Sequence, residues 1–226
     1  MRRAIRFIPA SYYHICNKSN DSSAIFLENR DYARMLFFIL FYQFSTPFFN
    51  IGRSISYFEK HTQFNISDEE IGRLLPGRVV ELNAFAIMPN HFHLLIQEKE
   101  RGGTSSYLHR LQGGYAKYFN AKYQKGGHVF RGSFRAVSVE TDKQLLYLSA
   151  YIHRNPRALQ AWTNKEISYP WSSYQDFARE NRWERLLNPS IVLNQFTTQK
   201  SYREFVDTST AKLKTSDSSI EDLFLE

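Results

Sequence analysis

The pattern of hydrophobic and polar positions predicts a chain in which strands and helices are mixed. Short runs rich in β-branched and aromatic residues predict strands over 11–16, 79–88, 91–97 and 133–139. Longer apolar or amphipathic segments predict helices over 31–44, 104–125 and 141–155. Only Pro89 and Asn90 separate the two middle strands, which indicates an antiparallel hairpin. We therefore predict the α+β class, with helices packed on a mostly antiparallel sheet.

Sequence signals also define both ends of the third predicted helix. Thr141 can cap its N-terminus while the Gln144 side chain reaches back to the capping residue, as in a capping box. Pro156 ends the helix near Asn155, because the residue before a proline avoids the helical conformation. We therefore expect Asn155 at the C-terminal end of this helix.

Two regions predict less regular structure. Residues 45–78 look irregular, except for a short helix that Ser67 can cap. After about residue 175 the pattern thins; 201–213 predicts one more helix, and the acidic, serine-rich 216–226 predicts a loosely ordered tail. We therefore divide the chain into a domain over 1–175 and a C-terminal extension over 176–226.

The composition is that of a globular protein without membrane spans. Hydrophobic residues make up 42% and charged residues 23% of the 226 positions. The longest uninterrupted apolar run, 35–42, is far shorter than the ~20 residues that a membrane span needs. The lone Cys16 excludes an internal disulfide framework and a zinc site of several cysteines. We expect a cytoplasmic protein.

Positive charge is concentrated in one segment of this basic chain. The formal net charge is +7, and the segment 101–139 contains no aspartate or glutamate. Its positive residues are Arg101, Arg110, Lys117, Lys122, Lys125, Arg131 and Arg135. Aromatic residues are interleaved with them, although those at helical spacing, such as Tyr115 and Tyr118, also suit a core. Cations that neutralise phosphates, next to aromatic faces that stack on unpaired bases, favour binding of single-stranded nucleic acid.

Two histidines share one face of a predicted strand. Side chains alternate along a strand, so His91 and His93 point to the same side, about 7 Å apart at the backbone. Imidazoles in this arrangement can converge on one metal ion. The alternative, a pair of strand histidines that only make hydrogen bonds, stays open at this point.

The third predicted helix carries possible partners for these histidines. Tyr147, Tyr151 and Asn155 are spaced four residues apart, so they lie on one helix face, with neighbours about 6 Å from each other. A tyrosine one turn from a carboxamide can offer a nucleophile and a further metal ligand together. Tyrosine and asparagine are also common at helix ends, so this spacing alone does not define a site.

Four motifs occur in one order along the chain. They are Met-Pro-Asn-His-Phe-His-Leu-Leu (88–95), Tyr-Ala-Lys-Tyr-Phe-Asn (115–120), Tyr-Ile-His-Arg-Asn-Pro (151–156) and Tyr-Pro-Trp-Ser-Ser-Tyr (169–174). Together they resemble the REP-associated tyrosine transposases, a branch of the insertion-sequence transposases that are named for an HUH motif. The resemblance extends from about Tyr12 to Tyr174.

The resemblance implies a fold, a reaction and a set of site residues. It implies an RRM-like antiparallel sheet, with the two histidines on a central strand and the tyrosine on a helix that faces them. It also implies dependence on Mg²⁺ or Mn²⁺, cleavage of single-stranded DNA beside a hairpin, and a covalent 5′-phosphotyrosine. Carried over to this sequence, the metal ligands are His91, His93 and Asn155, and the nucleophile is Tyr151.

The DNA partner should meet the positive residues around these motifs, and the protein should act as a monomer or a homodimer. The predicted DNA-binding residues are Arg110, Lys117, Lys122, Lys125, Arg131, Arg135 and Arg154.

Two other functions fit the same sequence features. A non-catalytic DNA- or RNA-binding protein of RRM-like shape would use the basic, aromatic surface without a metal or a nucleophile. A metal-dependent hydrolase would use the histidines but would let water attack, so it would form no covalent intermediate. A covalent protein–DNA adduct separates the predicted transposase from both.

Overall fold

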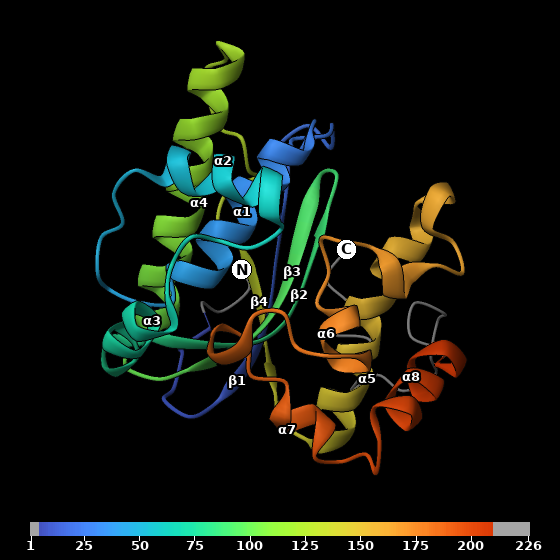
Figure 1. The fold of residues 1–226 in the computed structure, drawn as a ribbon. Coiled ribbons are helices and arrows are strands. Elements are labelled where there is room, and N and C mark those ends of the chain that lie inside the picture. The colour runs from blue at the N-terminus through green and yellow to red at the C-terminus, as the bar shows by residue number, and fades with distance from the viewer. Residues whose placement is uncertain (1–4, 210–226) are drawn as a thin grey trace.

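A four-stranded antiparallel sheet forms the centre of the fold (Figure 1). The computed structural model describes residues 5–209. The strands are β1 (Tyr12–Lys18), β2 (Val80–Met88), β3 (His91–Glu98) and β4 (Arg135–Val139), in the spatial order β2-β3-β1-β4. With helices between β1 and β2 and between β3 and β4, this order is that of RRM and ferredoxin-like domains. The predicted α+β class, with the two histidines on a central strand, is confirmed.

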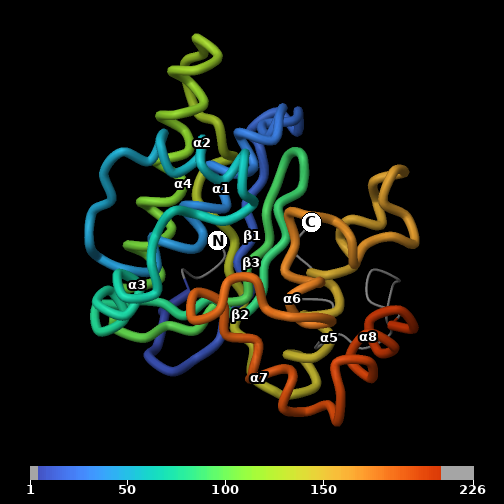
Figure 2. Tube along the Cα trace, viewed as in Figure 1, coloured from blue at the N-terminus to red at the C-terminus, as the bar shows by residue number. Residues whose placement is uncertain are grey.

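Helices cover both faces of the sheet. Helices α1 (Asn29–Phe41) and α4 (Gly103–Tyr123) lie on one side, and α5 (Asp142–Arg154), α6 (Tyr174–Ala178) and α8 (Gln199–Thr208) lie on the other (Figures 1 and 2). Strand alternation explains this division, since Phe92, Leu94 and Ile96 point from β3 toward α1 and α4 and are fully buried. The residues between them, which include His91 and His93, point toward α5.

Local signals fix the limits of α5, and two glycines lie inside α4. Thr141 and Gln144 form the predicted capping box at the start of α5, and Asn155 is its C-cap. Helix α4 runs without a break through Gly113 and Gly114. A Cβ atom at Gly114 would lie 3.4 Å from side-chain atoms of Phe38 and Tyr42, so this glycine lets α1 and α4 pack closely.

The segment 45–78 is more regular than its sequence suggests. The short helix capped by Ser67 is present as α3 (Asp68–Leu74). A further helix, α2 (Ile51–His61), begins at Asn50, which has a left-handed conformation and gives no side-chain cap. Ile55 and Phe58 of α2 are buried in the core. The prediction of an irregular segment was wrong here, because tertiary packing stabilises a helix that lacks a start signal.

The last two helices of the described C-terminal extension pack against α5. The last predicted helix is present as α8, shorter and earlier than expected, and a single turn, α7 (Ser190–Leu193), precedes it. Short 3₁₀ segments complete the chain: η1 (Leu75–Gly77), η2 (Asn155–Ala158), η3 (Gln160–Trp162), η4 (Glu166–Ser168) and η5 (Glu184–Leu186). The predicted acidic tail lies outside the described residues. Between residues 5 and 209, no helix combines the length and apolarity needed to cross a bilayer.

Candidate active site

Strand β3 carries His91 and His93 on the face covered by α5. The two rings are perpendicular, with centroids 5.0 Å apart. His91, at the start of the strand, is half-buried, whereas His93 is 1% exposed. The shared orientation predicted from strand alternation is therefore present, with His91 nearer to the surface.

The hydrogen bond of His91 defines which ring nitrogen carries its proton. Nδ1 of His91 lies 2.7 Å from Oδ1 of Asn90, and Nδ2 of Asn90 donates to the carbonyl oxygen of Ser22. Because the amide oxygen can only accept, His91 donates through Nδ1–H. A neutral imidazole protonated at Nδ1 presents its lone pair at Nε2, the form in which histidine ligates a metal.

Tyr151 projects from α5 onto the same face of the sheet. Its ring meets that of His93 edge-on, with centroids 5.3 Å apart, and it is 1% exposed. Tyr147, one turn earlier, instead contacts Phe205 of α8. Of the two, only Tyr151 therefore packs against a histidine of the HUH motif.

The tyrosines of the basic helix are engaged on the opposite side of the sheet. The Tyr115 hydroxyl donates to the carbonyl oxygen of Ile25, and the Tyr118 hydroxyl donates to Asp31. Burial raises the pKa of both phenols, that of Tyr118 to about 12. Both hydroxyls therefore stabilise the packing of α4, and neither suits a nucleophile.

Asn155 ends α5 with a polar group that is partly unsatisfied. The residue is fully buried, and its Nδ2 donates to the backbone oxygen of Tyr151 at 2.9 Å. Its Oδ1 is buried and has no hydrogen-bond partner among residues 5–209. An unpaired buried acceptor costs roughly 1–3 kcal/mol, so an orphaned amide oxygen requires an explanation. Coordination of a cation would satisfy it.

These residues fit a divalent ion with mixed ligands. The described part of the chain has no cluster of three or more histidine, cysteine or acidic side chains suited to a metal. The candidate donors are instead a mixed set: the imidazoles of His91 and His93 and the carboxamide oxygen of Asn155. Carbonyl-type oxygen and water suit Mg²⁺ and Mn²⁺. Because His93, Tyr151 and Asn155 are all buried, DNA can reach them only if their surroundings move.

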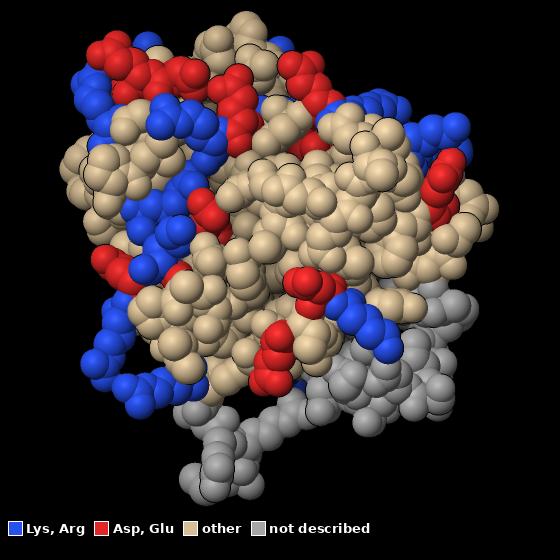
Figure 3. All heavy atoms as spheres, turned by 90° about the horizontal axis from the view of Figure 1, so that it is seen from below, with Lys and Arg blue, Asp and Glu red and all other residues tan. Residues whose placement is uncertain are grey.

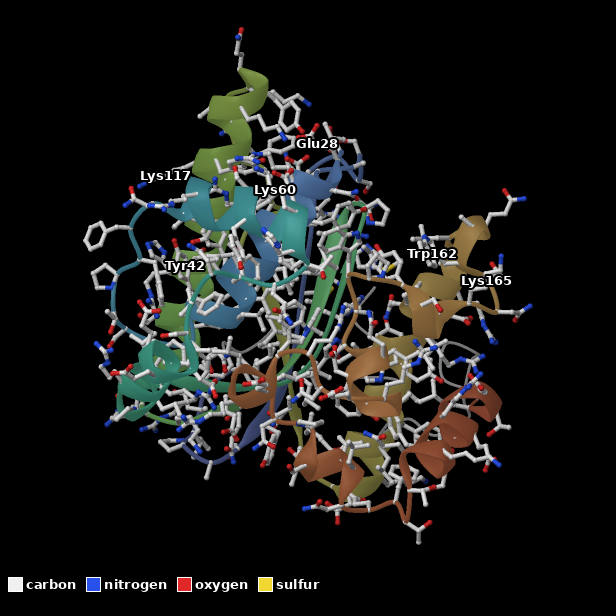
Figure 4. The ribbon with its side chains drawn as sticks, viewed as in Figure 1. Glu28, Tyr42, Lys60, Lys117, Trp162 and Lys165 are labelled. Carbon is white, nitrogen blue, oxygen red and sulfur yellow. The ribbon has the colours of Figure 1, made fainter. Side chains whose placement is uncertain are left out.

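Four of the predicted DNA-binding residues are exposed. They are Lys117, Lys125, Arg131 and Arg135. Figure 4 shows Lys117 on the outer side of α4, away from the sheet. Arg135 lies opposite Cys16, which also pairs with His93, so these three positions form one row across the sheet.

Arg131 also lies near the histidine end of the sheet. Its backbone N–H donates to the carbonyl oxygen of Lys18, the residue that pairs with His91. Two of the exposed predicted cations are thus on β4 and on the segment that leads to it.

The other three predicted DNA-binding residues bind groups within the protein. Arg110 donates to the carbonyl oxygens of Tyr42 and Phe44, and Arg154 donates to those of Val206 and Asp207. Lys122 forms ion pairs with Glu28 and the buried Asp31. These cations stabilise the fold, and we leave them out of the proposed DNA surface.

One residue of the site was not predicted. His14 of β1 is fully buried, and its ring contacts both His93 and Tyr151. The signal that could have identified it is strand alternation, which places His14 and Cys16 on one face of the first strand. The strand pairing that brings β1 beside β3 is what makes that face relevant.

The strand order and the histidine pair define an RRM-like α+β protein with two histidines on a central strand. Residues 57–155 match the model of the family described as "Transposase IS200 like". The matched segment contains His91, His93 and Tyr151 and ends at Asn155. The predicted resemblance is confirmed at the level of this transposase family.

A solved structure is also similar to the chain, at low identity. It is described as "Structure of the REP associates tyrosine transposase bound to a REP hairpin". The two share 16% identity over 78% of this chain and 84% of that chain, with a TM-score of 0.49. No curated protein matches the chain.

Proposed function

We propose that this protein is a metal-dependent transposase that cleaves and rejoins single-stranded DNA beside hairpins, with Tyr151 as its nucleophile. The observation that carries the proposal is the contact of Tyr151 with His93, in a helix that ends one turn later at Asn155. One short helix segment thus carries the phenol that contacts His93 and, one turn later, the unpaired amide oxygen of Asn155. The hairpin partner follows from the motifs shared with REP-associated transposases.

His91, His93 and Asn155 are the residues that would hold Mg²⁺ or Mn²⁺. A free phenol has a pKa near 10, so only about 0.1% is ionised at pH 7 and full deprotonation costs ~4 kcal/mol. A bound divalent ion would lower that cost and polarise the scissile phosphate. The contribution of the protein is to hold Tyr151 in one orientation, through the packing of α5 on β2 and β3.

The reaction exchanges one phosphodiester for another. Oη of Tyr151 forms a bond to phosphorus while the bond to the 3′-oxygen breaks. The phenolic proton leaves, and the departing 3′-oxygen takes up a proton. Because the product is a phosphotyrosine ester, the freed 3′-hydroxyl can attack it and reverse the step. Strand transfer therefore needs no ATP.

The exposed cations near β4 give the DNA a path to this site. Arg131 and Arg135 lie beside the histidine end of the sheet, and the last turns of α4, which lead to Lys125, project beyond the sheet (Figure 1). Seen from below, the molecule shows positive and negative groups next to one another around a broad uncharged area (Figure 3). We therefore place the DNA at the end of the sheet that carries His91.

A covalent adduct tests the proposal. The protein is incubated with Mn²⁺ and labelled single-stranded DNA that carries a hairpin, and the products are run on a denaturing gel. We expect a protein–DNA adduct that Tyr151→Phe abolishes, because this variant lacks only the attacking oxygen. Tyr147→Phe, one turn away on the same helix and directed at α8, is the matched control and should form the adduct.

The other outcomes identify the alternative functions. Binding without cleavage would indicate a nucleic-acid-binding protein, and cleavage without an adduct would indicate a hydrolase. Full adduct formation by Tyr151→Phe would show that another residue is the nucleophile.

A further inference from the structure

His14 lies at the centre of the candidate site but belongs to none of the ligand or nucleophile positions assigned above. It stands in the middle of β1 and is fully buried. Its ring lies side by side with that of His93, with centroids 5.2 Å apart and planes inclined by 23°. Its Nε2 lies 3.0 Å from Nδ1 of His93, and its ring centroid lies 5.8 Å from that of Tyr151.

The hydrogen bond between the two histidines can have two directions. If His14 donates, Nδ1 of His93 carries the lone pair, and the proton of a neutral His93 is on Nε2. If His93 donates, its proton is on Nδ1, and Nε2 presents a lone pair. Only the second arrangement lets His93 ligate a cation through Nε2.

The neighbouring histidine of the motif shows the same arrangement. Asn90 accepts from Nδ1 of His91, so His91 presents its lone pair at Nε2. Histidine ligands generally donate their second ring N–H to a protein acceptor. His14 is in hydrogen-bond distance of Nδ1 of His93 and can be that acceptor.

We propose that His14 is a positioning residue that accepts the Nδ1–H of His93 and thereby makes Nε2 of His93 the ligating atom. The same hydrogen bond also holds the His93 ring nearly in the plane of the His14 ring, with Tyr151 edge-on to both. The inference rests on the proposed metal site for its functional meaning. The tautomer itself is a property of the metal-free protein, so it can be tested separately.

Two substitutions separate the acceptor role of His14 from its packing role. His14→Phe keeps a flat ring of similar size against His93 but removes the acceptor nitrogen. His14→Gln loses the ring but offers an amide oxygen to Nδ1–H of His93. If His14 only fills space, the phenylalanine variant should resemble the wild type more closely than the glutamine variant does.

The first measurement is the ¹⁵N spectrum of the histidine rings in metal-free protein. We expect wild-type His93 to be protonated at Nδ1 and unprotonated at Nε2. His14→Gln should retain this tautomer, whereas His14→Phe should give a mixture of the two. A wild-type His93 protonated at Nε2 would overturn the proposal.

The second measurement is Mn²⁺ affinity by calorimetry, together with thermal unfolding to verify that each variant is folded. Outer partners of histidine ligands contribute about 10–100-fold to metal affinity, so His14→Phe should lose affinity by that factor and His14→Gln should recover most of it. If His14→Phe keeps its affinity while His93→Ala loses binding, only the role proposed for His14 is contradicted. Unchanged affinity in His93→Ala would instead contradict the metal site of the proposed function.

Discussion

The two faces of the sheet contain similar residue types that are used differently. On the face covered by α1 and α4, the buried Asp31 accepts hydrogen bonds from Tyr118, Tyr123 and Lys122 and from two backbone N–H groups. On the face covered by α5, Asn155 retains an amide oxygen with no partner among the described residues. Buried polar groups are nearly always paired, so the paired carboxylate of Asp31 fits a structural role, and the unpaired oxygen of Asn155, one turn from Tyr151, fits a site that binds a cation.

The largest expected effect follows from the histidines of the α5 face. His91→Ala/His93→Ala should lower Mn²⁺ affinity by more than about 100-fold, because the loss of ligands exceeds the effect of their outer partners. Calorimetry measures this effect. His109→Ala/His128→Ala removes two exposed histidines and should bind Mn²⁺ as the wild type does. Equal Mn²⁺ affinities of the two double variants would show that His91 and His93 contribute no more to metal binding than two exposed histidines do.

A second prediction concerns stability on the α1/α4 face. Burial disfavours ionisation of Asp31, but hydrogen bonds from Lys122, Tyr123 and Tyr118 outweigh it and hold its pKa below the usual range. Asp31→Asn should lower the free energy of unfolding by about 3 kcal/mol, since it leaves a partly buried lysine without its buried counter-charge. The same lysine also pairs with Glu28, whose side chain is 55% exposed. Glu28→Gln removes this more exposed partner and should cost less than about 1 kcal/mol.

Asp31→Asn should also change how the stability of the protein depends on pH in acid. Because the pKa of Asp31 is lower in the folded state, its contribution is complete above the unfolded pKa of about 4 and is lost as the pH falls further. Denaturant titrations between neutral pH and acid should therefore show a smaller loss of stability for Asp31→Asn than for the wild type. Parallel pH profiles would show that Asp31 does not carry this dependence.

The smallest expected effect concerns the exposed cations. Lys117→Ala/Arg131→Ala/Arg135→Ala should weaken single-stranded DNA binding and flatten the plot of log affinity against log salt by up to about 2 units, or about 0.7 for each phosphate contact. Lys60→Ala, an exposed lysine on α2, is the control and should leave the slope unchanged (Figure 4). A wild-type slope for the triple variant would mean that these three residues make no phosphate contacts.

Short-range patterns predicted the parts of the candidate site that belong to single elements. Strand alternation placed His91 and His93 on one face, and the capping box at Thr141 with the stop at Pro156 placed Asn155 at the end of α5. These signals act over a few residues, through backbone geometry, so they are present in the sequence itself. The missed helix α2 has no such signal, since Asn50 gives it no side-chain cap.

The sequence by itself thus determined the four strands, the helices of the sheet layers that carry start and stop signals, the shared face of the two histidines and the position of Tyr151 one turn before Asn155. Only the tertiary structure decided which polar groups meet. His14 and His93 are 79 positions apart, and Lys122 lies 91 positions from Asp31. Arg110, Lys122 and Arg154 have the same charge in the sequence as the exposed Lys117 and Arg131, yet they are turned inward and bind groups inside the protein. The physical reason is that a hydrogen bond or ion pair depends on atoms brought within about 3 Å by the packing of distant elements, and no local pattern contains that distance.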